Sequence, residues 1–239
     1  MTINILHLYP KEMNLYGDHG NVLALTRRCE WRGVETKVYA YEPGEVIPDD
    51  IDIIFGGGGQ DSGQSKIETD LLKIASKLKE MIDRGVPALA ICGIYQLFGK
   101  YFHTHEDKMI EGIGIFDLYT EAGPTRLIGN TVIESEEFGE IVGYENHSGL
   151  TYLGDGVSAL GKVRVGMGNN GTDGMEGIRY KNSIGTYLHG PVLPKNPALA
   201  DFLIKTALEN KTGEKVILEP LDDSIELNAH KVAATRPRQ

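Results

Sequence analysis

The stretch R-G-V-P-A-L-A-I-C-G-I-Y-Q-L-F-G, residues 84–99, decides the fold. Residues 86–91 form an apolar run typical of a buried strand, and a helical pattern begins at Gly93. Cys92 stands between the two. A strand followed by a nucleophile-type residue, a small residue and a helix is the pattern of a nucleophile elbow, whose tight turn exposes the nucleophile at the carboxyl edge of a sheet. The alternative is that Cys92 is a buried small residue, which is the commoner fate of an isolated cysteine and the one expected for Cys29 in a helix.

The segments around this stretch alternate between strands and helices. Strands are expected at 3–8, 38–41, 51–55 and 86–91, and helices at 17–32 and 67–82. This alternation predicts an α/β fold with a doubly wound, mostly parallel central sheet flanked by helices. Short strands between Gly- and Asn-rich turns from about 113 to 187 predict an antiparallel β extension of that sheet in the C-terminal half.

No internal repeat or low-complexity linker divides the 239 residues, so a single domain, 1–239, is expected. Its core spans about 3–210. A helical pattern at 196–210 ends this core. A C-terminal helix and tail follow at about 211–239, with a second helical pattern at 218–232.

Composition and charge narrow the classes of function. The formal charge is −10 and no long basic run occurs, which argues against nucleic acid as a partner. Two cysteines in a chain of this length are typical of a reducing compartment, so we expect the cytoplasm. No window approaches the ~18 apolar residues of a membrane span.

Two further strand ends carry residues suited to chemistry. The stretch I-I-F-G-G-G-G-Q-D, 53–61, ends in four glycines whose N–H groups could converge on an anion, but it matches no nucleotide-binding loop. The stretch N-S-I-G-T-Y-L-H-G-P, 182–191, places His189 where a general base could serve Cys92. His19 and His147 lie in turn-like segments that could line a site. No His, Cys or Asp set has the spacing of metal ligands, so no metal site is expected.

Together these stretches resemble the class I (triad-type) glutamine amidotransferases. The segment G-Y-E-N-H-S-G, 143–149, points to the cobyric acid synthase-like branch. A closer resemblance, over about 3–232, is to the GatD family of glutaminase subunits of lipid II isoglutaminyl synthase. It is carried by M-N-L-Y-G-D-H-G-N (13–21), P-T-R-L-I-G-N (124–130), G-N-N-G-T-D-G-M-E-G (168–177) and G-T-Y-L-H-G-P-V-L-P-K-N-P (185–197).

The resemblance implies an enzyme that hydrolyses L-glutamine to glutamate and ammonia. A MurT-type Mur ligase-like partner, forming a heterodimer with this subunit, would use ATP and the ammonia to convert the D-glutamate of the lipid II stem peptide to D-isoglutamine. The chain has no ATP-binding motif. We therefore expect no cofactor in this chain, and expect ATP and any metal to bind the partner.

The resemblance also assigns roles to residues. Cys92 would be the nucleophile and His189 the base, with an oxyanion hole formed by the backbone N–H groups of Gly57 and Gly93. Arg126 would bind the substrate α-carboxylate. Further candidates for holding the substrate are Gln96, Asn146 and His147.

The sequence departs from the family pattern in two places. Family elbows have glycines at the positions of Ala90 and Ile94, so Ile94 is expected to narrow the pocket. The family also has a carboxylate two residues after the histidine, where this chain has Pro191. Either a dyad of Cys92 and His189 suffices or an acid comes from elsewhere, for which the partner is an attractive donor. We therefore expect low glutaminase activity of the isolated subunit.

Three other functions are compatible with the pattern. The first is a glutaminase serving another ATP-dependent amidase of the cobyric acid synthase type. The second is a non-catalytic regulatory module on the same fold, although both the nucleophile and the base are present. The third is a Cys/His peptidase-like hydrolase, which the segment around Arg126 disfavours.

Overall fold

The computed structural model describes residues 1–238 and contains two sheets. The first consists of β1 (Thr2–Leu8), β2 (Glu35–Tyr41), β3 (Ile53–Gly56), β4 (Ala88–Ile91), β11 (Ile178–Tyr180) and β12 (Ser183–Thr186). Their order is β11-β12-β4-β3-β1-β2, and all neighbours are parallel except β11 and β12. β3, β4 and β12 are buried throughout, as expected for inner strands of a parallel sheet that is covered on both faces. This confirms the predicted doubly wound sheet.

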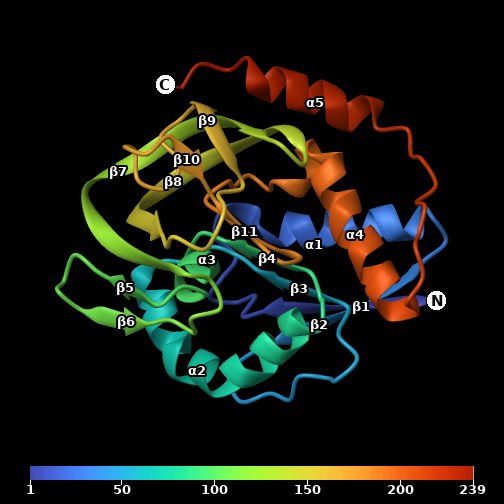
Figure 1. Ribbon diagram of the computed structural model, residues 1–239, viewed down its shortest axis with the longest axis horizontal. Helices are drawn as coiled ribbons and strands as arrows, with labels where there is room; N and C mark the ends of the chain where they lie inside the picture. Colours follow the sequence, from blue (N-terminus) through green and yellow to red (C-terminus); the bar gives the residue numbers. More distant parts are fainter. Residues whose placement is uncertain (239) are drawn as a thin grey trace.

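Helices cover both faces of this sheet (Figure 1). Figure 1 shows α2 (Asp61–Asp83) on one side, and α1 (His19–Glu30) with α4 (Pro197–Thr212) on the other. The short α3 (Gly93–Leu97) follows β4, and a 3-10 turn, η1 (Leu15–Gly17), precedes α1. The strand order reverses between β1 and β3, and the crevice at the carboxyl ends of strands flanking such a point is where doubly wound folds bind ligands.

The antiparallel strands that were predicted are present, but most of them form a second sheet. It contains β5 (Tyr101–His103), β6 (Met109–Glu111), β7 (Leu118–Ser135), β8 (Gly139–Leu153), β9 (Gly161–Val165) and β10 (Met175–Glu176). β7 and β8 pair with each other as a long hairpin, whereas β11 extends the first sheet at its edge. One buried apolar cluster includes residues of both sheets, so they share a core.

The C-terminal part crosses from the first sheet to the second. After α4 and a turn at Gly213, the chain runs without regular structure to Asp223 and then forms α5 (Ser224–Ala234) over β7 and β8. The helix predicted from residue 218 begins at Ser224. Another 3-10 turn, η2 (Leu193–Lys195), precedes α4. Within residues 1–238, no helix is long and apolar enough to cross a membrane.

Candidate active site

Cys92 lies on the predicted elbow. It directly follows β4, which pairs in parallel with β3 on one side and β12 on the other. Its backbone has φ 46° and ψ −98°, a region that side chains other than glycine rarely adopt. The Cys92 N–H donates to the Thr186 carbonyl at 2.8 Å, which ties the turn to β12. The strained turn places Cys92 directly before α3.

His189 reaches the same edge of the sheet from β12. Thr186, the last residue of β12, is level with Ile91, the last residue of β4, and His189 follows three residues later. The imidazole is 1% exposed. A Cβ atom built on Gly58 would lie 2.6 Å from His189 Cε1 and 3.2 Å from Cys92 Cβ. The two side chains therefore meet against the glycine run that follows β3.

The structure adds a carboxylate that the sequence did not assign. Both oxygens of Asp18 lie 3.3 Å from His189 Nδ1, and Asp18 Oδ2 also accepts the Gly58 N–H at 2.7 Å. Asp18 is completely buried. Cys92, His189 and Asp18 thus form a continuous set in which the imidazole stands between a thiol and a carboxylate.

Packing around Pro191 explains why Asp18 reaches the histidine. A Cβ atom on Gly20 would lie 2.5 Å from Pro191 Cγ, so the turn after His189 packs directly on the start of α1. Asn21 Oδ1 accepts the Leu193 N–H at 2.9 Å and fixes this contact. The proline thus occupies the place of the family's carboxylate and brings a different carboxylate to the imidazole.

The electrostatics of His189 depend on these neighbours. Burial lowers the pKa of His189, but the negative charge of the Cys92 thiolate and the Asp18 carboxylate outweigh it and raise the pKa to about 10. The charged imidazolium form of His189 is therefore favoured. In contrast, burial raises the pKa of Cys29 to about 12, so that thiol stays neutral in α1 as expected for a packing residue.

A cavity of about 510 Å³ opens in front of Cys92. Gly59 and Cys92 line it from the first sheet, and Arg126, Asn146 and His147 line it from the second. The pairing of β7 with β8 is interrupted between Ala122 and Leu127, and this irregularity carries Arg126. Arg126 Nε donates to Asn146 Oδ1, which holds the guanidinium at the cavity. Within the described part of the chain, no group of three or more His, Cys, Asp or Glu side chains could hold a metal ion.

Gln96 and His147 also line the cavity, and buried contacts fix both side chains. Gln96 Oε1 accepts from Gln64 at 2.8 Å, and its Nε2 donates to the Tyr187 hydroxyl at 3.0 Å. His147 stacks on the Tyr187 ring at 3.5 Å, and its Nδ1 lies 2.7 Å from the Gly149 carbonyl oxygen. Burial lowers the pKa of His147 to about 3, so this imidazole is neutral and offers no positive charge to a substrate carboxylate.

One expectation about the elbow needs correction, whereas the oxyanion role of Gly57 stays a prediction. Gly59 lines the cavity, and a Cβ atom on Gly57 would meet the Met13 carbonyl. Ile94 does not narrow the pocket, because its side chain is completely buried and packs on Gly56 in the core. The sequence placed Ile94 next to the nucleophile, but it gave no direction for the side chain.

Comparison with known proteins identifies the family of the chain. Residues 4–197 match the CobB/CobQ-like glutamine amidotransferase domain. The chain is 45% identical, over 98% of its length and 96% of the relative, to "Lipid II isoglutaminyl synthase (glutamine-hydrolyzing) subunit GatD" of Staphylococcus aureus. It is 41% identical, over 92% of its length and 86% of the relative, to the protein of the same name from Streptococcus pneumoniae.

Solved structures agree on the fold. One, described as a glutamine amidotransferase, superposes with a TM-score of 0.58 at 15% identity, covering 85% of this chain and 98% of that one. The PurLQS structure from Thermotoga maritima gives the same TM-score and coverage at 14% identity. With its elbow cysteine, buried histidine and adjoining cavity, the chain belongs to the CobB/CobQ-like glutamine amidotransferase family and is an enzyme of that class.

Proposed function

We propose that this protein is the glutaminase subunit of a lipid II isoglutaminyl synthase, hydrolysing L-glutamine to glutamate and ammonia. The observation that carries the proposal is the set of Cys92, His189 and Asp18 next to a cavity that Arg126 lines. The identities of 45% and 41% to two GatD subunits support the choice of synthase.

The first half-reaction follows from the positions of these groups. The Cys92 thiolate attacks the side-chain amide carbon of glutamine, and the carbonyl electrons move to the oxygen. We assign the oxyanion to backbone N–H groups at the start of α3, with Gly93 first, and in the glycine run after β3, with Gly57 as the predicted donor. When the C–N bond breaks, the His189 imidazolium gives its proton to the leaving nitrogen, which departs as ammonia and leaves a thioester on Cys92.

Water then completes the cycle. His189, now neutral, takes a proton from a water molecule that attacks the thioester, and glutamate leaves with regeneration of the thiolate. Asp18 orients the imidazole through Nδ1 and stabilises its charged form. Because Asp18 makes this contact from within the chain, the missing carboxylate at position 191 no longer argues for low activity of the isolated subunit.

Substrate recognition is assigned to the second sheet. Arg126 presents a planar guanidinium beside the cavity and pairs with the glutamine α-carboxylate, with Asn146 fixing its orientation. Replacing Arg126 with alanine is expected to raise KM for glutamine by about 10- to 100-fold with little change in kcat, since charged hydrogen bonds contribute ~1.5–3 kcal/mol. Steady-state glutaminase kinetics measure this directly.

The acceptor of ammonia lies outside this chain. We propose a MurT-type Mur ligase-like partner that uses ATP to amidate the D-glutamate α-carboxyl of the lipid II stem peptide, in a cytoplasmic heterodimer. The free thiols of Cys29 and Cys92 are consistent with that compartment. Co-expression with such a ligase and a glutamine-dependent gain of D-isoglutamine in lipid II would support the pairing, whereas glutaminase activity without amidation would refute it.

The glutaminase half is tested with a glutamine-like electrophile. Incubation with 6-diazo-5-oxonorleucine, alone and with the partner, should place one adduct on Cys92, and glutamine should protect against it. Cys29 is the internal control, because its buried neutral thiol should stay unmodified. The Cys92→Ser variant should remain unlabelled. Absence of an adduct on Cys92 even with the partner would refute the proposed function.

One alternative acceptor has a specific observation in its favour. The chain is 27% identical to a "Probable cobyric acid synthase" of Methanothermobacter thermautotrophicus, over 79% of this chain but 38% of the relative. A corrinoid amidase would therefore need a synthetase part from elsewhere. Amidation of a cobyric acid precursor instead of lipid II would favour this second function.

A further inference from the structure

The C-terminal segment, residues 213–238, forms a strap across the molecule. It leaves α4, crosses beside α1 and ends over the second sheet after α5 (Figure 1). The family match ends at residue 197, before this strap begins. The strap therefore lies outside the part of the chain that carries the amidotransferase pattern.

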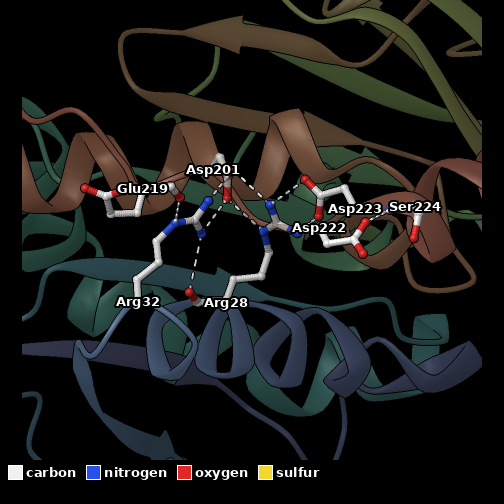
Figure 2. Close-up of polar contacts among 7 residues, drawn as sticks. All are labelled: Arg28, Arg32, Asp201, Glu219, Asp222, Asp223 and Ser224. Atoms are coloured by element: carbon white, nitrogen blue, oxygen red, sulfur yellow. Dashed lines mark hydrogen bonds and ion pairs between the residues drawn. The ribbon is translucent and has the colours of Figure 1, made fainter.

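The first part of the strap is anchored to two arginines of α1. Figure 2 shows Arg28 between Asp201 of α4 and Asp223 of the strap, and its guanidinium bonds both carboxylates in a bidentate manner. Arg32 also pairs with Asp201 and donates to the Glu219 carbonyl at 2.8 Å. Burial disfavours the charge on Arg28, but hydrogen bonds to Asp201 and Asp223 raise its pKa above the ordinary value. The start of the strap is thus fixed to a rigid pair of helices.

The end of the strap is anchored to the hairpin of β7 and β8. Asn130 Nδ2 donates to the Ala233 carbonyl at 3.0 Å and to the Arg236 carbonyl at 3.3 Å. The stem of Arg238 packs on Gly129, where a Cβ atom would lie 2.7 Å from Arg238 Cγ. Arg238 Nη2 then lies 2.9 Å from Glu145 Oε1. The strap therefore ends on a buried carboxylate of the hairpin that also carries Arg126 and Asn146.

Glu145 connects this contact with the cavity. It is completely buried and directly precedes Asn146 in β8, so the two side chains project from opposite faces of one strand. Its oxygens accept the N–H groups of Met167 and Gly168 at 2.8 Å each. Asn169, which follows Gly168, accepts a hydrogen bond from the Tyr95 hydroxyl at 3.1 Å. Tyr95 lies in α3, the helix that follows Cys92. Glu145 is thus bonded on one side to the strap and on the other to the loop that supports the elbow.

The charge on Glu145 depends on Arg238. Burial raises the pKa of Glu145, while the two N–H donors and the Arg238 guanidinium act in the opposite direction. Removing the cation leaves a buried carboxylate with less compensation, which either takes up a proton or draws in water. Either response changes the bonds of Glu145 and shifts the strand that carries Asn146 and, through it, Arg126.

We propose that Arg238 is a positioning residue for glutamine binding, which acts through Glu145 to hold Asn146 and Arg126 at the cavity. This inference rests on the proposed function. Arg238 touches none of the reacting atoms, so its loss weakens substrate binding and leaves the chemical step at Cys92 unchanged. The bonds of Arg28 to Asp223 and of Arg32 to the Glu219 carbonyl hold the strap in place. The position of Arg238 depends on that anchor.

The test measures labelling of Cys92 by 6-diazo-5-oxonorleucine over a range of concentrations in the full chain. Arg238→Gln should raise the half-saturating concentration about 3- to 30-fold, the range for residues that act through a neighbour, with the limiting rate unchanged. Arg238→Lys should restore most of the affinity. Asp223→Asn, which loosens the start of the strap, should also raise the half-saturating concentration, but by a smaller factor than Arg238→Gln. The matched control is Arg236→Gln, since Arg236 is an exposed arginine of the same tail.

Three results would overturn the inference. The first is equal half-saturating concentrations for Arg238→Gln and Arg236→Gln. The second is a fall of the limiting rate in Arg238→Gln, which would show damage to the chemical step. The third is a lower thermal midpoint of Arg238→Gln that accounts for its loss of labelling. Failure of the unsubstituted chain to label with the partner present is distinguishable from these, because it refutes the proposed function and with it this inference.

Discussion

Gly58 is the point at which the three groups of the site meet, and adding one methyl group there tests the geometry. In Gly58→Ala the new Cβ would lie 2.6 Å from His189 Cε1, whereas ordinary contacts are 3.4–4 Å, so the imidazole must retreat by 0.8–1.4 Å. The same atom would lie 3.2 Å from both Asp18 Oδ2 and Cys92 Cβ, which leaves little freedom to move elsewhere. A displacement of about 1 Å costs about 100-fold in rate, or ~2.7 kcal/mol. Gly58→Ala should therefore lower kcat/KM for glutamine by about that factor.

The assay compares glutaminase kinetics and Cys92 labelling for Gly58→Ala and a control with the same change in composition. Gly156→Ala is suitable because its new Cβ would meet nothing within 4 Å. Thermal unfolding of both variants separates local displacement from loss of the fold. A Gly58→Ala protein that is folded and retains kcat/KM within about threefold of the control would refute the arrangement of His189 against Gly58.

Three further changes test other parts of the site. Asp18→Asn removes a carboxylate that raises the pKa of His189, so that pKa should fall and kcat should drop about 100-fold; an unchanged kcat would contradict the role of Asp18. Ile94→Ala should lower the free energy of unfolding in urea by about 3 kcal/mol and leave KM unchanged, since Ile94 packs on Gly56 in the core; a change in KM at equal stability would contradict that orientation. Burial raises the pKa of Glu176 from 4.5 to about 7, so between these two pH values the folded chain keeps a proton that the unfolded chain releases. The folded state therefore loses stability relative to the unfolded state as pH rises from 4.5 to about 7. The stability of the wild type relative to Glu176→Gln should therefore fall by about 3 kcal/mol between pH 4.5 and pH 7, measured by urea unfolding, and a constant difference would exclude a buried titrating Glu176.

The elbow could be predicted from the sequence because its signal is local. An apolar strand, a cysteine, a glycine and a helical pattern are consecutive in residues 86–99, and the structure has the same order in β4, Cys92 and α3. His189 was identified for a similar reason, since its position just after a strand-like run limits where the side chain can lie. The parallel sheet followed from the alternation of strands and helices, which also brings the carboxyl ends of β3, β4 and β12 to one edge.

Asp18 could not be assigned in the same way because its contact spans 171 residues. The segment that contains it, G-D-H-G-N, was noted for its histidine, and nothing in its spacing indicates that the aspartate turns inward. The directions of Ile94 and of the glycine run after β3 depend on the path of two turns after strands. Turns at strand ends are decided by tertiary contacts, here with Gly56 and the Met13 carbonyl, that no short window of sequence contains.

The position of Pro191 shows how a family site can keep its geometry while changing its chain path. A carboxylate two residues after the histidine would reach the imidazole from the same segment of chain. In this protein Pro191 occupies that position and packs against Gly20. The same packing draws the start of α1 to the imidazole, so the residue that replaced the acid also delivers Asp18. Because Asp18 is held by the Gly58 N–H and Pro191 by Gly20, the orientation of His189 depends on glycines that admit no side chain at two separate contacts.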